Sequence, residues 1–148
     1  MLPDELPDAD EDAGLTREDV ERRVDDWLNR LRDLLRIVER WAMDNGWAIE
    51  SRDAVPMHEE LMERFGLAQR EQPGLTLRDR AGDKLLVRPK GLWVIGANGR
   101  VDLFTKRGAF VLIDAAEPFS APNWRLFKVG GGHENGRDFD PSMLSDMV

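Results

Sequence analysis

The chain has 148 residues, a net charge of −8 and no cysteine, so disulfides, thiolate nucleophiles and thiolate metal sites are excluded. No apolar run reaches the roughly 20 residues that span a bilayer. The first residues also lack the basic and apolar regions of a secretion signal. We therefore expect a cytoplasmic, single-domain protein with no membrane partner.

The first 14 residues hold six acids, no bases and few apolar side chains. Such a segment buries too little apolar surface to offset chain entropy, so we expect an acidic disordered arm over residues 1–14. The alternative is an acidic peptide that docks on a basic surface, including the protein's own sheet.

Capping signals bound a long helix. Thr16 is a favourable N-cap, and Asp19 stands three residues later, which is close to a capping box. Asn45 and Gly46 form a left-handed C-terminal signal, so the helix is predicted to end near Asp44. A helix of this span is about 42 Å long, which exceeds a typical strand of ~17–20 Å.

Apolar side chains recur along this helix at alternating spacings of four and three residues, which is a heptad seam. The seam residues are Val20, Val24, Trp27, Leu31, Leu34, Val38 and Trp41. A second stripe of Leu28, Leu35 and Ala42 widens the face, which favours packing on a sheet or in a bundle. Two uses stay open: core packing within one chain, or an interface with a homodimer partner or another protein.

The region between this helix and residue 75 predicts two short elements. Trp47–Glu50 has the composition of a short strand. Pro56 fits the first position of a short helix that ends before Gly66. The apolar face of that helix would carry Met57, Leu61 and Phe65. Residues 67–74 are expected to form a polar connection.

From residue 75 to 129, β-rich runs alternate with turn signals, which is typical of an antiparallel meander. The predicted strands are Leu75–Asp79, Lys84–Arg88, Leu92–Gly96, Arg100–Thr105, Ala109–Asp114 and Trp124–Val129. Asn98-Gly99 is the strongest hairpin signal, because a type I′ turn needs two residues with positive φ. The predicted fold class is α+β: a long N-terminal helix and a short helix packed on a five- or six-stranded antiparallel meander. Residues 15–129 form this single domain.

The turns also predict the register of the meander. A turn at Asn98-Gly99 and a three-residue turn at 106–108 place Arg100 opposite Asp114, with Asp102 on the same face. Both sheet faces are then apolar at their centre, so we expect a layer on each side. The long helix would form one layer. A second helix, the C-terminal segment or another protein would form the other.

Residues 130–148 begin with a glycine-rich run, which has the composition of a flexible linker. Asp140, Pro141 and Ser142 have the pattern of an N-cap followed by the first position of a helix. Apolar residues follow at Met143, Leu144 and Met147. The segment is therefore either a short docked helix or a disordered tail.

Catalytic and metal-binding patterns are sparse. The two histidines, His58 and His133, are isolated, and Met62 stands where a zinc-protease motif needs its second histidine. The glycine runs lack the Lys-Ser/Thr pair of a phosphate-binding loop. Our first interpretation therefore has no catalytic residue, no metal and no cofactor.

Two strand-borne acids support a second interpretation. Asp102 and Asp114 stand on neighbouring predicted strands, and Glu117 follows shortly after. This arrangement resembles the acids of PD-(D/E)XK nucleases, which implies that these carboxylates would bind Mg²⁺ for cleavage of nucleic acid. The chain departs from that family at Ala116, where the family has its lysine.

The meander is basic although the whole chain is acidic, since residues 75–129 hold ten Lys or Arg and five acids. A basic sheet suits nucleic acid or an acidic partner. The candidate contacts are Lys84, Arg88, Lys90, Lys106, Arg107, Arg125 and Lys128. Solvation, or protection of sheet edges from aggregation, explains the same charges.

The first interpretation is a non-catalytic protein-interaction domain, such as an immunity, antitoxin or chaperone-like partner or a subunit of a bacterial assembly. It follows from the lack of a catalytic constellation, the long helical seam and the two apolar sheet faces. The alternative is a nucleic-acid-binding or PD-(D/E)XK-like nuclease domain that uses the basic meander.

Overall fold

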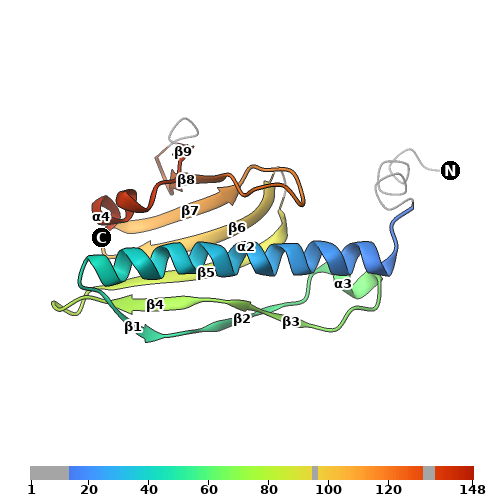
Figure 1. The fold of residues 1–148 in the computed structure, drawn as a ribbon, viewed down its shortest axis with the longest axis horizontal. Helices are drawn as coiled ribbons and strands as arrows, with labels where there is room; N and C mark the ends of the chain where they lie inside the picture. Colours follow the sequence, from blue (N-terminus) through green and yellow to red (C-terminus); the bar gives the residue numbers. More distant parts are fainter. Residues whose placement is uncertain (1–13, 95–96, 132–135) are drawn as a thin grey trace.

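The computed structural model describes residues 14–94, 97–131 and 136–148. One long helix lies across one face of a curved antiparallel sheet, as Figure 1 shows. The predicted α+β class is therefore confirmed, with seven strands in the sheet in place of five or six. The predicted acidic arm (apart from Gly14) and His133 lie outside the described residues.

The elements follow the chain in a simple order. The helices are α2 (Arg17–Asp44), α3 (Glu60–Arg64) and α4 (Leu144–Met147), and a 3-10 turn η1 (Pro141–Met143) precedes the last. The large sheet contains β1 (Ala48–Ser51), β4 (Leu75–Arg78), β5 (Lys84–Val94), β6 (Ala97–Thr105), β7 (Gly108–Asp114), β8 (Trp124–Lys128) and β9 (Arg137–Asp138), in that spatial order. A separate two-stranded sheet pairs β2 (Ala54–Met57) with β3 (Arg70–Pro73).

The long helix has the boundaries that its capping signals predict. The Thr16 hydroxyl accepts from the Asp19 amide at 3.1 Å, and the Asp19 carboxylate accepts from the Thr16 amide at 3.0 Å. This reciprocal pair satisfies two amides that a helix start would otherwise leave open. Gly46, just past the C-cap Asn45, has φ of +76°, which L side chains rarely adopt.

The region from 47 to 74 differs from its prediction. Pro56 lies in strand β2, and α3 begins only after Glu59. A proline is tolerated there because β2 pairs on one side only, with β3. Met57 consequently belongs to a strand, and the buried residue of α3 is Met62. Residues 70–73 form a strand in place of the predicted polar connection.

The hairpin between β5 and β6 does not turn at Asn98-Gly99. Trp93 pairs with Asn98 and Val94 with Ala97, so Asn98 and Gly99 lie within β6. The predicted strands 84–88 and 92–96 are joined as one strand, β5, whose register shifts between Pro89 and Gly91. A bulge at this point accommodates the missing amide hydrogen of proline.

Gly99 has a structural role other than a turn. Its φ is +115°, and a Cβ at this position would lie 2.1 Å from the ring of Trp27. The glycine therefore lets the β6 backbone approach the indole of α2. Trp27 is fully buried, and its Nε1 donates to Oε1 of Gln72 on β3 at 2.9 Å.

The next turn is one residue shorter than predicted, because Thr105 pairs with Gly108. The register of β7 against β6 consequently shifts by one residue, and Arg100 lies opposite Ile113 instead of Asp114. A shift of one residue moves a side chain to the other face of a sheet. The predicted trio of Arg100, Asp102 and Asp114 on one face is therefore wrong.

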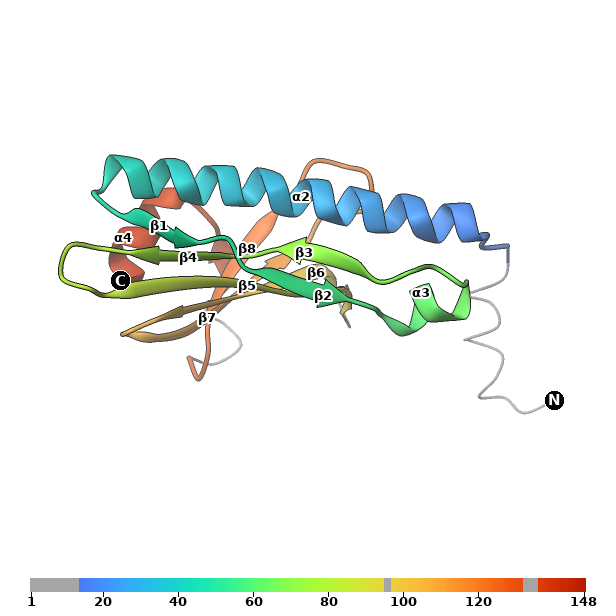
Figure 2. The same ribbon diagram turned by 90° about the horizontal axis from the view of Figure 1, so that it is seen from below.

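The two faces of the sheet are covered differently. α2 lies along one face, and Figure 2 shows that no helix of the described chain lies along the other. Side chains from α2 and from the covered face form one hydrophobic core, which the C-terminal helix joins through Leu144 and Met147. Trp41 of α2 donates to Ser145 Oγ at 3.0 Å, which holds the end of the chain against the long helix.

Candidate functional site

The three acids proposed as metal ligands do not converge. Asp102 on β6 lies opposite Val111 on the neighbouring strand β7, so their side chains share one face. Asp114 lies three residues after Val111 on β7. Successive side chains of a strand point to opposite faces, so the two carboxylates lie on opposite sides of the sheet. Within the described residues, no group of three or more His, Asp or Glu side chains is placed to bind a metal ion.

Asp114 instead belongs to a buried ion pair with the long helix. Its Oδ2 accepts from Arg30 Nη1 at 2.7 Å, and its Oδ1 accepts from the amides of Ala116 and Asn123 at 3.0 and 2.9 Å. The side chains of Arg30 and Asp114 are 3% and 0% exposed. A carboxylate with this set of donors is fully occupied in a structural role.

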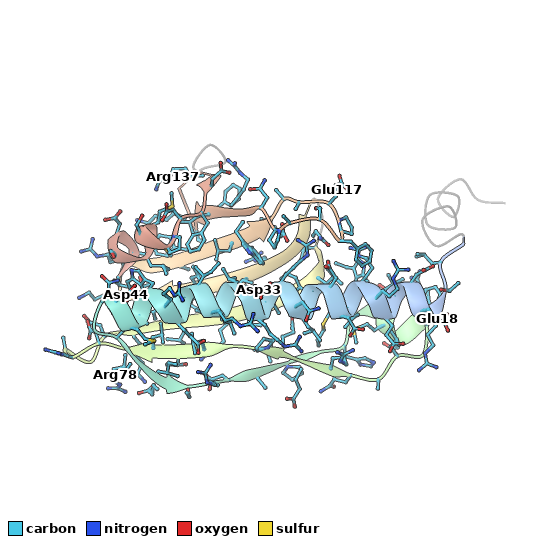
Figure 3. All side chains as sticks on the ribbon, in the orientation of Figure 1. Glu18, Asp33, Asp44, Arg78, Glu117 and Arg137 are labelled. Carbon is cyan, nitrogen blue, oxygen red and sulfur yellow. The ribbon has the colours of Figure 1, made fainter. Side chains whose placement is uncertain are left out.

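Arg30 also connects α2 to the loop that follows β7. It donates to Asp26 at 2.8 Å and to the carbonyl oxygens of Glu117 and Ser120. Burial alone would lower the pKa of Arg30, but hydrogen bonds to Asp26 and Asp114 outweigh it and raise that pKa. Glu117 therefore contributes its backbone carbonyl, and not its carboxylate, to the contacts of Arg30. Figure 3 shows Glu117 on the loop beyond the sheet.

Asp102 forms a different ion pair on the open face, which is the sheet face that α2 does not cover. Arg100 Nε donates to Asp102 Oδ1 at 2.8 Å. The two side chains are 37% and 19% exposed, so water reaches this pair. Arg100 and Asp102 share one face, as the sequence analysis predicts, whereas the pairing of Asp114 with Arg30 was not predicted.

Most of the basic residues proposed as nucleic-acid contacts have acidic partners. Lys84 pairs with Glu50, Arg88 with Asp53, Lys106 with Asp83 and Arg125 with Asp138. Glu50 and Asp138 lie on the edge strands β1 and β9, Asp53 lies between β1 and β2, and Asp83 lies in the turn between β4 and β5. The positive charge of the meander is therefore largely neutralised within the fold.

The remaining candidates are spread over the molecule. Lys128 Nζ lies 6.0 Å from the centre of the Phe110 ring, on the covered face. Lys90 and Arg107 form no ion pair with any residue that the structure describes. No single basic face results from this arrangement, because the cations occupy a bulge, a turn and both faces.

The helical seam is buried within the chain. Its seven residues are between 0% and 6% exposed, and all of them except Val20 belong to the central core cluster. Core packing therefore accounts for the seam. As long as the chain keeps this fold, those side chains are not presented to a homodimer partner or another protein.

Apolar side chains gather instead on the open face. Leu86 pairs with Phe104, and Val111 pairs with Phe127, while Ile113 lies two residues along β7 from Val111. We call these five residues the open-face patch. Phe104 is 41% exposed, the largest exposure among them. Val111 is buried at 8% exposure, so the other four side chains provide the exposed part of the patch. Exposed apolar side chains with charged neighbours are typical of interaction sites.

Ion pairs border the open-face patch. Asp53 Oδ2 accepts from Thr76 Oγ1 at 2.7 Å and lies 3.1 Å from Arg88 Nη2. Hydrogen bonds from Thr76 and Ser51, together with the Arg88 charge, hold the pKa of Asp53 below its ordinary value. Arg125 and Asp138 pair at 2.7 Å on the other side.

Sequence reasoning missed two charged side chains, Arg30 and Glu59, that connect other elements to the sheet by hydrogen bonds. Arg30 sits beside the seam, so helical periodicity alone gives no signal for its burial. The Glu59 carboxylate accepts from the amides of Leu92 and Trp93, both at 3.0 Å. The sequence offers one signal for this contact, the isolated glycine Gly91 within a strand, which is typical of a close approach to the backbone. In the structure, a Cβ at Gly91 would lie 3.1 Å from the Glu59 carboxylate.

The side chain of His58 is exposed. Separately, no helix in the described chain is both long and apolar enough to cross a membrane. The open-face patch, with the ion pairs beside it, is our candidate interaction surface. Comparisons of the chain with protein-family models, with curated proteins and with solved structures find no match.

Proposed function

We propose that this chain is a non-catalytic, cytoplasmic protein-interaction domain, of the immunity, antitoxin or chaperone-like kind or a subunit of a bacterial assembly. The observation that carries the proposal is the open-face patch. It places two phenylalanines and three aliphatic side chains on the sheet face opposite α2, where Phe104 is 41% exposed, although Gly136 packs against Phe127 and Val111 is buried. Aromatic side chains with a polar rim are enriched at protein interfaces.

The border of the patch supports recognition of a protein more than of nucleic acid. The cations next to the patch, such as Arg88 and Arg100, are already paired with acids of the same chain. A nucleic-acid surface needs cations that are available to neutralise phosphates. A protein partner instead needs an apolar centre and hydrogen-bonding groups of both signs at the rim.

A photo-cross-linking amino acid at position 104 tests the proposal. The full chain carrying it is irradiated in extracts of its native cells, and the same amino acid at position 43 is the control. Met43 is 80% exposed on α2, away from the sheet. We expect a discrete cross-linked protein from position 104 that position 43 does not capture.

The purified partner then allows a quantitative test. Phe104→Arg is expected to raise the dissociation constant by more than about tenfold, because it places a charge in an apolar contact. Met43→Arg should leave it unchanged. Equal binding by both variants would overturn the proposal. Salt-sensitive binding of short oligonucleotides that is insensitive to Phe104→Arg would favour the nucleic-acid alternative.

A further inference from the structure

A cavity of about 450 Å³ lies between the covered face of the sheet and the C-terminal helix. Its residues come from the turn after β6, from β7, β8 and β9, and from η1 and α4. Pockets for small molecules in proteins have volumes of about 300 to 1,000 Å³, so this one can hold a compact ligand. It is separate from the open-face patch, which faces the other way.

The inner wall of the cavity is apolar. It contains Phe110 and Leu126 from the sheet and Met143 and Met147 from the C-terminal segment. Phe110, Leu126 and Met147 are 8%, 5% and 3% exposed. This wall suits a hydrocarbon or aromatic body, because burying such a body removes apolar surface from water.

Cationic side chains form part of the cavity lining. Arg107, Lys128 and Arg137 line it, with Asp146 as the one acid among the described lining residues. Within the described residues, Arg107 and Arg137 form no ion pair, in contrast to Arg88, Arg100 and Arg125 elsewhere on the sheet. Arg137 belongs to β9, and Figure 3 shows it at the edge of the sheet. Two arginines that form no ion pair among the described residues, beside a single described acid, favour an anion at this place.

Hydrogen bonds hold the walls in position. Thr105 Oγ1 donates to the Met147 carbonyl at 2.6 Å, which fixes α4 over the end of β6. Arg125 Nη2 donates to the Gly136 carbonyl at 2.9 Å, which ties the start of β9 to β8. These two bonds hold α4 and the start of β9 against the sheet, which lowers the cost of ordering those parts of the wall on binding.

We propose that this cavity binds a small organic anion with an apolar body. The head group would be a carboxylate, since the guanidinium of arginine offers paired donors that match its two oxygens. The apolar body would lie on the phenylalanine, leucine and methionine wall. This inference is independent of the protein-interaction function, which uses the opposite face.

The methyl groups of methionine report directly on the cavity. Octanoate is titrated, below its micelle concentration, into the full chain labelled with ¹³C at methionine methyls. Met143 and Met147 should shift with one saturation curve, whereas Met43 on α2 and the core residues Met57 and Met62 should not. Equal shifts of Met43, or none at Met143 and Met147, would overturn the proposal.

Matched ligands and variants separate the head group from the body. 1-Octanol, which lacks the charge, and inorganic phosphate, which lacks the body, should each bind at least about tenfold more weakly than octanoate. Arg107→Gln and Arg137→Gln should each weaken octanoate by about tenfold. Both side chains are exposed, so the folded state should persist, which unchanged Met57 and Met62 signals would verify.

Two control variants complete the test. Arg80→Gln removes an exposed arginine from the turn between β4 and β5, and Phe104→Ser alters the open-face patch. Neither should change the octanoate affinity. The proposal fails if 1-octanol binds as tightly as octanoate, or if Arg80→Gln weakens binding as much as Arg107→Gln and Arg137→Gln do.

Discussion

Leu103 and Phe104 are neighbours on β6, yet Leu103 is fully buried beneath α2 and Phe104 is 41% exposed on the opposite face. The covered face combines apolar packing with one buried ion pair, Arg30–Asp114. The open face combines a partly exposed apolar patch with ion pairs that water reaches, such as Arg100–Asp102. The difference indicates that apolar burial is concentrated on the covered face, whereas side chains of the open face remain in contact with water.

The largest expected effect separates the two ion pairs. Arg30→Ala leaves the Asp114 carboxylate buried without its cation, which should cost about 3–5 kcal/mol of unfolding free energy. Arg100→Ala, the matched change on the open face, should cost less than about 1 kcal/mol. Urea unfolding of both variants measures these two losses of unfolding free energy. Similar losses would contradict the difference between the buried and the exposed ion pair.

The neighbouring pair on β6 gives the second contrast. Leu103→Ala empties a fully buried position and should cost about 3 kcal/mol. Phe104→Ala should cost less than about 1 kcal/mol, because its ring is already partly in water. If thermal or urea unfolding shows a large loss for Phe104→Ala, the open face contributes to the core and the comparison fails.

Gly99→Ala tests the close approach of β6 to α2. The new methyl group would collide with the Trp27 ring at a φ that L residues avoid, so we expect a loss of about 2 kcal/mol or more. The double variant Gly99→Ala with Trp27→Leu should show strong non-additivity, because the smaller side chain makes room. Additive losses in urea unfolding would indicate that Trp27 is not the obstacle.

The smallest expected effect concerns Asp53 and pH. Its pKa is lowered in the folded chain, so its hydrogen bonds stabilise the fold at pH values above the unfolded pKa of about 4. That contribution is lost as the pH falls through the lower, folded pKa. Wild-type protein should therefore be more stable than Asp53→Asn at pH 6, with a difference that shrinks as the pH falls below the unfolded pKa. A difference independent of pH would contradict this assignment.

The elements that sequence reasoning identified correctly are those with local causes. The capping box of Thr16 and Asp19, the heptad seam and the N-cap at Asp140 each depend on residues a few positions apart. Such signals act before any tertiary contact forms, so the α+β class and the long helix follow from them.

The strand register of β6 could not be predicted from the sequence, and the reason is physical. Asn98-Gly99 has the composition of a hairpin turn, but this glycine serves the contact with Trp27, which lies 72 positions earlier in the chain. Nothing local distinguishes the two uses of glycine. A second error, one residue too many in the turn at 106–108, misplaced Asp114, because one residue of register exchanges the sheet faces.

The seam of α2 also sets an order of events during synthesis. The helix emerges from the ribosome first, whereas Ser145, which accepts from Trp41, lies 104 residues later. Until β4 to β8 have been translated, the growing chain exposes an amphipathic helix with no sheet to cover it. The chain can therefore bury this seam only after most of the sheet has been translated.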